Sequence, residues 1–218
     1  MRRFLAAALL ALTAACAPEK SRDFELGLIG PVGPGVEAAS RAAGMSIREA
    51  APEGADVHGV GVAFKGASGR SEERLADWAH LRLLVARAAV RGRTGVFFIL
   101  PKSADGREVT WFPEEWQALA RVAHETSAMR PILESVVEAA VPFPVPDGVQ
   151  ARAWRFQGRL YLLLVNGDGP SAPLPDESLR PWRALFEVRA DTRDLLNACG
   201  GGCCLPGDRV LWLEGRLW

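Results

Sequence analysis

The sequence predicts an α/β region followed by an all-β region, and two patterns along the chain indicate this order. Between residues 24 and 133, short apolar segments alternate with longer segments of helical periodicity. Such alternation is typical of βα units with a parallel sheet. Beyond the Pro-rich segment VPFPVPDG, residues 141–148, apolar segments are short and closely spaced. We therefore predict about three βα units and then a small antiparallel β-sandwich.

The first region contains three predicted strands and three predicted helices. The strands are expected at 24–29, 57–64 and 94–100. The helices are expected over 36–43, from Ser71 to about Arg91, and from Pro113 to near Pro131. In the second helix Ser71 would be the N-cap, with Glu72 and Glu73 in the first turn, where acidic side chains are favourable.

The second region is predicted to contain only strands. They are expected at 149–156, 160–165, 184–188 and 209–213. Gln157-Gly158 lies between the first two, and this pair is typical of a tight hairpin turn.

The N-terminus has the layout of a secretory signal. Two arginines precede an apolar stretch that is too short to span a bilayer, and small residues follow. The segment LTAAC resembles the lipobox of bacterial lipoproteins, which implies cleavage before Cys16 and acylation of that cysteine. The alternative is an ordinary cleaved signal with a chance cysteine. We predict a signal peptide over 1–15, a lipid-anchored tether over 16–23, and domains over 24–140 and 141–218.

The anchor implies a location in the cell envelope, with the membrane as a partner through lipid on Cys16. In a diderm host, Ala17 after the cysteine favours the outer membrane by the same resemblance. The longest apolar run in the rest of the chain, residues 81–90, is interrupted by Arg82 and Arg87, so a membrane span is not expected there.

Composition and motifs disfavour several other partners. The chain has 26 basic and 26 acidic residues, so no basic surplus attracts nucleic acid. GPVGPG is a poor phosphate loop because its prolines lack N–H donors. The histidines have no zinc-binding spacing. We expect no nucleotide, cofactor or metal.

A resemblance to (β/α)₈-barrel glycoside hydrolases rests on three segments. VGVAFKGASGRSEERLADWAHLRLLVARAAVRGRTGVFFIL resembles the last two βα units of these enzymes. WFPEEWQALARVAHETSAMRPILES is similar to their eighth helix, and GVQARAWRFQGRLYLLLVNGDGP through RVLWLEGRL to the β-sandwich that follows. The resemblance implies that residues 24–140 form part of a barrel, with strands seven and eight at 57–64 and 94–100.

Two departures from the family affect catalysis. A closed barrel typically takes about 250 residues, and only about three βα units fit here. The resemblance puts one catalytic carboxylate after the fourth strand and the nucleophile at the end of the seventh. The fourth strand has no counterpart, and Phe64-Lys65-Gly66 stands at the expected nucleophile position. Glycoside hydrolysis needs two carboxyl groups, so we predict no catalytic residues.

Three functions remain open at this point. The first is a non-catalytic envelope lipoprotein that binds a glycan or an envelope protein. The second is an active glycoside hydrolase with a barrel that is shortened or completed by a partner. The third is a purely structural module. Glu72 and Glu73 are weak acid/base candidates, whose alternative is helix-terminal charge facing water. Trp111 is a candidate sugar contact, while core packing explains other tryptophans such as Trp116 and Trp212.

The segment CGGGCC carries Cys199, Cys203 and Cys204 in a Gly-rich turn. In an exported protein these cysteines are disulfide candidates, with Cys199 paired to Cys203 or Cys204. Three thiols without a nearby histidine make a poor zinc site, because a structural site normally has four ligands.

Overall fold

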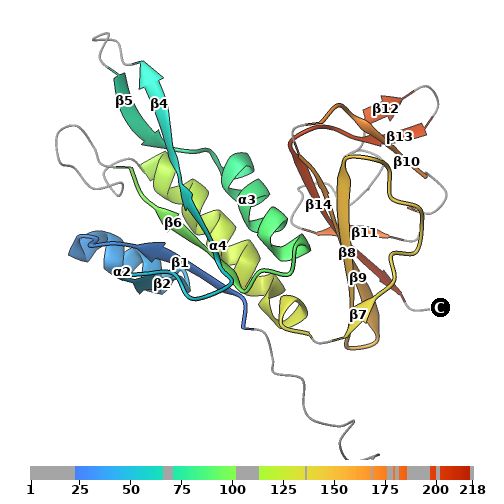
Figure 1. Cartoon of the computed structure of the whole chain (residues 1–218), viewed down its shortest axis with the longest axis horizontal. Coiled ribbons are helices and arrows are strands. Elements are labelled where there is room, and N and C mark those ends of the chain that lie inside the picture. Colours follow the sequence, from blue (N-terminus) through green and yellow to red (C-terminus); the bar gives the residue numbers. More distant parts are fainter. Residues whose placement is uncertain are drawn as a thin grey trace, which may run out of the picture.

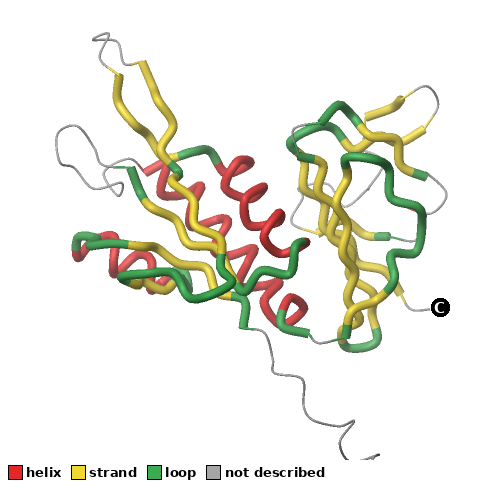
Figure 2. Tube along the Cα trace, in the orientation of Figure 1, coloured by secondary structure: helices red, strands yellow, loops and turns green. Residues whose placement is uncertain are grey.

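The computed structural model describes most of the chain downstream of the predicted tether. The described residues are 23–65, 71–101, 113–135, 137–167, 169–175, 179, 182–185, 197–199 and 202–216. They form layers: a parallel sheet, a pair of helices, and an antiparallel sheet with a smaller sheet beyond it (Figures 1 and 2). The predicted order, α/β and then all-β, is confirmed over the described residues.

The parallel sheet has four strands in the order β2-β1-β6-β3. These are β1 (Glu25–Ile29), β2 (Ser46–Arg48), β3 (Asp56–Gly59) and β6 (Gly95–Ile99), and every pairing among them is parallel. Gly27 of β1 is opposite Phe97 of β6 and leaves room for the Phe97 ring. A Cβ at Gly27 would lie 2.5 Å from Phe97 Cε1 and 2.8 Å from the Ser46 carbonyl oxygen, so glycine fits best there.

Helices α2 (Pro34–Ala42), α3 (Trp78–Val90) and α4 (Pro113–Leu133) accompany this sheet. The first and third match the predicted helices, including the start at Pro113. The second begins later than predicted. Its N-cap is Asp77, whose side chain accepts a hydrogen bond of 2.9 Å from the His80 N–H, and Ser71 is not a cap.

The residues before α3 form a β-hairpin that sequence analysis missed. The predicted strand 57–64 is two strands, β3 and then β4 (Gly61–Lys65), and β4 pairs antiparallel with β5 (Ser71–Leu75). The interpretation of Glu72 and Glu73 as first-turn helix residues is therefore wrong. The hairpin projects beyond the C-terminal ends of the parallel strands (Figure 1).

The later part of the chain forms two antiparallel sheets. The larger has the order β11-β14-β9-β8-β7 and the smaller β10-β13-β12. The larger contains β7 (Glu138–Ala139), β8 (Val149–Phe156), β9 (Arg159–Asn166), β11 (Arg183–Leu185) and β14 (Arg209–Arg216). The smaller contains β10 (Ala172–Leu174), β12 (Asn197–Cys199) and β13 (Gly202–Leu205). The predicted tight turn between β8 and β9 is confirmed, with φ of 48° at Gln157 and 74° at Gly158.

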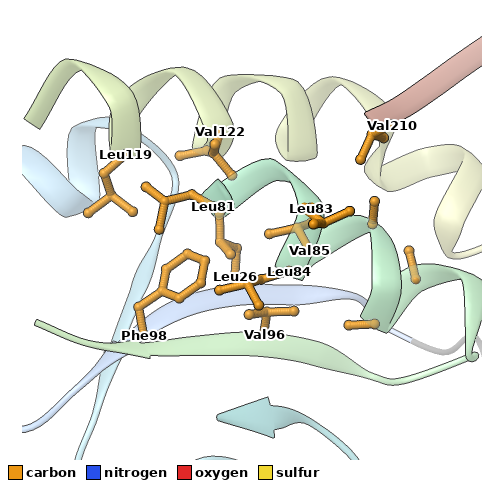
Figure 3. Packing of buried hydrophobic residues seen from close by; sticks show 14 of the residues in the cluster. Leu26, Leu81, Leu83, Leu84, Val85, Val96, Phe98, Leu119, Val122 and Val210 are labelled. Carbon is orange, nitrogen blue, oxygen red and sulfur yellow. The ribbon is translucent and has the colours of Figure 1, made fainter. Parts of the chain in front are cut away.

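Both faces of the five-stranded sheet are buried. Leu163 and Val165 of β9 belong to a core shared with the helices and the parallel sheet, whereas Leu162 and Leu164 belong to a second core with β10 and β13. Figure 3 shows the first core, in which Leu81 and Leu84 of α3 lie between the parallel strands and α4. The predicted domains over 24–140 and 141–218 thus share one core. β7, which precedes residue 140, pairs with β8.

Among the described residues, no helix is both long enough and apolar enough to cross a bilayer.

Candidate functional site

The C-terminal ends of the parallel strands form the first candidate site, because ligands of parallel α/β sheets bind at this edge. The strands end at Ile29, Arg48, Gly59 and Ile99. None of these four described end residues carries a carboxylate. The strand aligned by resemblance with the seventh barrel strand ends at Gly59, and Phe64-Lys65 belongs to the hairpin instead.

The sheet face that bears this edge lies opposite the helices. Leu26 and Leu28 face the helical core, so Glu25, Gly27 and Ile29 point to the other face. There the Arg48 Nε lies 2.8 Å from Glu25 Oε1. Burial opposes the ionisation of Glu25, but hydrogen bonds from Arg48 and Ser46 and the positive charges of Arg48 and Arg130 together outweigh it and hold the pKa of Glu25 below its ordinary value. Val57 and Ile99 remain 45% and 47% exposed on this face.

Glu72 and Glu73 occupy adjacent positions on the hairpin strand β5, opposite Phe64 and Ala63. Successive residues of a strand point to opposite faces, so the two positions do not share a face. Their side chains lie outside the described atoms. The hairpin thus separates the two weak acid/base candidates from each other, and neither lies in the first turn of α3.

Three of the tryptophans considered as sugar contacts lie in or against the hydrophobic core, and the fourth lies outside the described residues. Trp154 is completely buried and Trp212 is 6% exposed, and their ring centroids are 5.7 Å apart. Both pack between the five-stranded sheet and the helices, so neither offers a face for a sugar. Trp116 is partly buried against the same core. Trp111 lies outside the described residues, and its role as a sugar contact remains a prediction.

The histidines do not form a metal site. His58 lies on β3, and burial lowers its pKa below the ordinary value, an effect that Asp56 partly opposes. His80 and His124 lie on α3 and α4. Among the described residues, no group of three His, Cys, Asp or Glu is arranged to hold a metal ion.

A buried ion pair between α3 and α4 is the most unusual polar feature of the described residues. Arg82 Nε lies 2.9 Å from Glu125 Oε2, and both side chains are 8% exposed. Arg82 Nη1 also donates to the Val210 carbonyl of β14 at 3.2 Å. The pair therefore connects both helices to the five-stranded sheet.

Trp78 and Arg121 complete the surroundings of Glu125. Trp78 Nε1 donates to Glu125 Oε1 at 3.1 Å, and the Arg121 guanidinium lies 3.5 Å from the centre of the Trp78 ring. Burial raises the pKa of Glu125, and the two arginines and Trp78 only partly offset this effect.

The same pair lines a small cavity between α3, α4 and Trp212. Its volume is about 20 Å³, and Val122, Thr126 and Met129 line it as well. A space of this size holds about one water molecule and no sugar ring. We therefore assign the Arg82–Glu125 pair to the packing of the helices against the sheet.

The chain is similar to parts of several solved structures, and the similarity is limited to the fold. No protein-family model matches the sequence, and no curated protein matches it. Among solved structures, an α-amylase from Anoxybacillus has 13% identity and a TM-score of 0.39, over 63% of this chain and 32% of the amylase. Amy13B of Eubacterium rectale has 12% identity and a TM-score of 0.43, over 75% of this chain and 39% of Amy13B.

A third similar structure is a glycoside hydrolase family 30 subfamily 8 xylanase from Clostridium acetobutylicum. It has 14% identity and a TM-score of 0.37, over 89% of this chain and 49% of the xylanase. The chain thus spans from about a third to a half of the length of these glycoside hydrolases.

The cysteine-rich segment forms the hairpin of β12 and β13, where Cys199 pairs with Gly202 and Asn197 with Cys204. Cys204 is completely buried and is disulfide-bonded. The side chains of Cys199 and Cys203 lie outside the described atoms, so the identity of its partner remains a prediction. Cys16 also lies outside the described residues.

The buried pair was not predicted from the sequence, in which Arg82 stands as an interruption of the apolar run 81–90. An arginine within such a run, on a helix covered from two sides, is a signal for a buried acidic partner, because an unpaired buried charge is costly.

Proposed function

We propose that this chain is a lipid-anchored, non-catalytic protein of the cell envelope, built on a shortened glycoside-hydrolase plan. Three observations support the proposal: the lipobox-like LTAAC, the strand order of the parallel sheet, and the residues at the ends of its strands.

The strand order supports the proposal because it matches the order expected for a barrel that lacks its middle strands. In an eight-stranded barrel the first strand lies between the second and the eighth, and the seventh follows the eighth. The resemblance assigns β3 and β6 as strands seven and eight. The order β2-β1-β6-β3 then corresponds to two, one, eight, seven. Residues 49–55, which connect β2 to β3 without a helix, would replace strands three to six.

This replacement is the main reason for proposing a non-catalytic function. The segment 49–55 stands where the fourth strand and its carboxylate would be, and Gly59-Val60 stands where the nucleophile would be. Retaining and inverting glycosidases both need two carboxyl groups, which are roughly 5–10 Å apart. Gly59 and Val60 then provide no nucleophile. Within the segment 49–55, Glu53 lies just before β3 at the opposite edge of the sheet, and the exposed Glu49 after β2 is a single carboxyl group, which cannot fill both roles.

The test is hydrolysis of a panel of nitrophenyl glycosides by the purified mature protein from pH 4 to pH 8. We expect background rates. Turnover that disappears in Glu72→Gln or Glu73→Gln, but persists in the matched surface variant Glu114→Gln, would overturn the proposal. It would favour an active, shortened hydrolase.

The anchor is tested separately, by the Cys16→Ser variant. If Cys16 is acylated, the wild-type protein should fractionate with membranes and the variant should not. A variant that stays in the membrane fraction with its signal peptide uncleaved would contradict the anchor. In a diderm host, Ala17 should direct the wild-type protein to the outer membrane.

The bound partner is proposed to be a glycan or another envelope protein, and the helix-free sheet face favours this role. Parallel sheets normally have both faces covered, yet Val57 and Ile99 are about half exposed here. A glycan array with the wild-type protein and an Ile99→Asp variant would test the glycan. Loss of a positive signal in the variant would locate binding at this face, and a blank array would favour a protein partner or a purely structural role.

The same face supports a second candidate, in which a partner chain completes the barrel and supplies the carboxylates. The outer edges of β2 and β3 pair with no described strand, so both could accept another parallel strand. Co-expression with the neighbouring reading frame should then yield a stable complex with glycosidase activity. Recovery of this chain alone would reject the candidate.

A further inference from the structure

The tether and the start of β1 define which end of the molecule faces the bilayer. The fold begins at Phe24, which is buried and is the residue before β1. Phe24 lies at the N-terminal edge of the parallel sheet, where its N–H lies 3.4 Å from Glu134 Oε1 just after α4. The β4–β5 hairpin lies at the opposite edge (Figure 1).

The reach of the tether is short compared with the molecule. Residues 17–23 span at most about 25 Å when fully extended. Helix α4 has 21 residues and is about 30 Å long, and its C-terminal end lies beside Phe24, so its N-terminal end, on the side of the hairpin, is about 30 Å from the start of the fold. If the molecule were inverted, with the hairpin on the bilayer, Phe24 would be higher above the membrane than the tether can reach.

We propose that the N-terminal edge of the parallel sheet is the membrane-proximal surface, and that the hairpin and the strand ends point away from the bilayer. The proposal rests on acylation of Cys16. The proximal surface includes the segment around Glu53 and Gly54, which accept hydrogen bonds from Thr94 just before β6. Figure 1 places the turn between β8 and β9 at the same end.

Some charges at this end are paired: Arg93 pairs with Asp56 at 3.0 Å, and Arg130 lies 3.9 Å from Glu134. Arg91, at the end of α3, and Arg155, beside the turn between β8 and β9, are exposed and would add attraction to anionic headgroups. The tether sets the orientation, and it holds the candidate ligand-binding edge away from the bilayer.

The orientation can be measured by energy transfer from the lipidated protein to an acceptor dye on the headgroups of phosphatidylethanolamine–phosphatidylglycerol vesicles. A donor is attached through a genetically encoded azide residue at the position of Glu53 or, in a second protein, of Glu114. Both side chains are exposed, and they mark the two ends of the molecule. The two positions are separated by about 30 Å along the molecule, so energy transfer from position 53 should be at least about two-fold more efficient than transfer from position 114.

Two controls separate the orientation from the anchor. Vesicle flotation of the unlabelled wild type and of Cys16→Ser tests the anchor itself, and failure of the wild type to float would overturn both proposals. Flotation with equal or reversed transfer at the two positions would overturn the orientation alone. An insertion of about 20 Gly/Ser residues after Lys20 should abolish the difference, because the lengthened tether would exceed the height of the molecule.

Discussion

The two large sheets of this protein differ in how their faces are covered. The five-stranded antiparallel sheet is buried on both sides, and Leu162, Leu163, Leu164 and Val165 are at most 1% exposed. The parallel sheet is covered by helices on one side, whereas Val57 and Ile99 are about half exposed on the other. The usual association is the reverse, because parallel sheets are the ones that are normally covered twice.

The difference predicts where substitutions should be costly. The antiparallel sheet connects the helices on one side with the smaller sheet on the other, so its residues serve packing. On the face of the parallel sheet away from the helices, Phe97 is completely buried, but Val57 and Ile99 are about half exposed. Substitutions should therefore be costly for stability in the first sheet and mild at these exposed positions of the second.

The largest effect is expected from breaking the ion pair that fixes α3 and α4 on the antiparallel sheet. Arg82→Met leaves Glu125 buried without its nearest cation, which should cost about 3–5 kcal/mol of unfolding free energy. Denaturant titration checks this value. The double variant Arg82→Met/Glu125→Leu should cost less than Arg82→Met alone, since no charge is then left unpaired.

Truncations on both faces of β9 test whether that sheet is covered twice. Leu163→Ala faces the helices and Leu164→Ala faces the smaller sheet, and each should cost about 2–5 kcal/mol. Urea unfolding of the two variants gives the comparison. A cost below about 1 kcal/mol for either of them would mean that the corresponding face is open.

The helix-free face of the parallel sheet should tolerate the same kind of truncation at its exposed positions. Val57→Ala and Ile99→Ala remove methyl groups that are already about half solvated, so each should cost no more than about 1 kcal/mol. If Ile99→Ala costs as much as Leu164→Ala, another part of the chain must cover this face. Equal stability combined with lost binding would instead identify the face as a contact surface.

The smallest effect concerns pH. The pKa of Glu125 is raised above its ordinary value of 4.5 by burial, so the folded protein binds this proton at a higher pH than the unfolded chain. Glu125 should therefore make folding more favourable as pH falls from above its folded pKa to 4.5. Glu125→Gln should remove this trend, which thermal unfolding at several pH values would measure. A wild-type protein that loses stability relative to the variant on acidification would contradict the shift.

The order of elements could be predicted from local patterns, whereas the start of α3 could not. Ser71 followed by two glutamates resembles a helix start, because serine is a favourable N-cap and acidic side chains are favourable in the first turn. Pairing with residues 61–65 overrides it, and Asp77 takes the capping role instead. Whether such a segment forms a helix or a strand depends on its contacts with other parts of the chain. The sequence of the segment itself does not specify these contacts.

The strand order and the buried pair are beyond sequence patterns for a related reason. Nothing local to residues 25–29 indicates that they pair with 95–99 rather than with 56–59. The Arg82–Glu125 contact likewise depends on the rotation of two helices that are 43 positions apart along the chain at these residues. At the candidate site, the end of the predicted strand 57–64 was placed at Phe64, whereas β3 ends at Gly59 and Phe64 belongs to β4 of the hairpin.

The pairing of β1 with β6 also bears on how the chain folds as it emerges. Glu25 pairs with Gly95, so a chain that appears from its N-terminus must extend by about 70 further residues before the central neighbour of β1 is available. Until then β1 has β2 alone beside it, and a two- or three-residue ladder is too short to persist. The emerging β1 should therefore stay unpaired, and accessible to chaperones, until β6 has appeared.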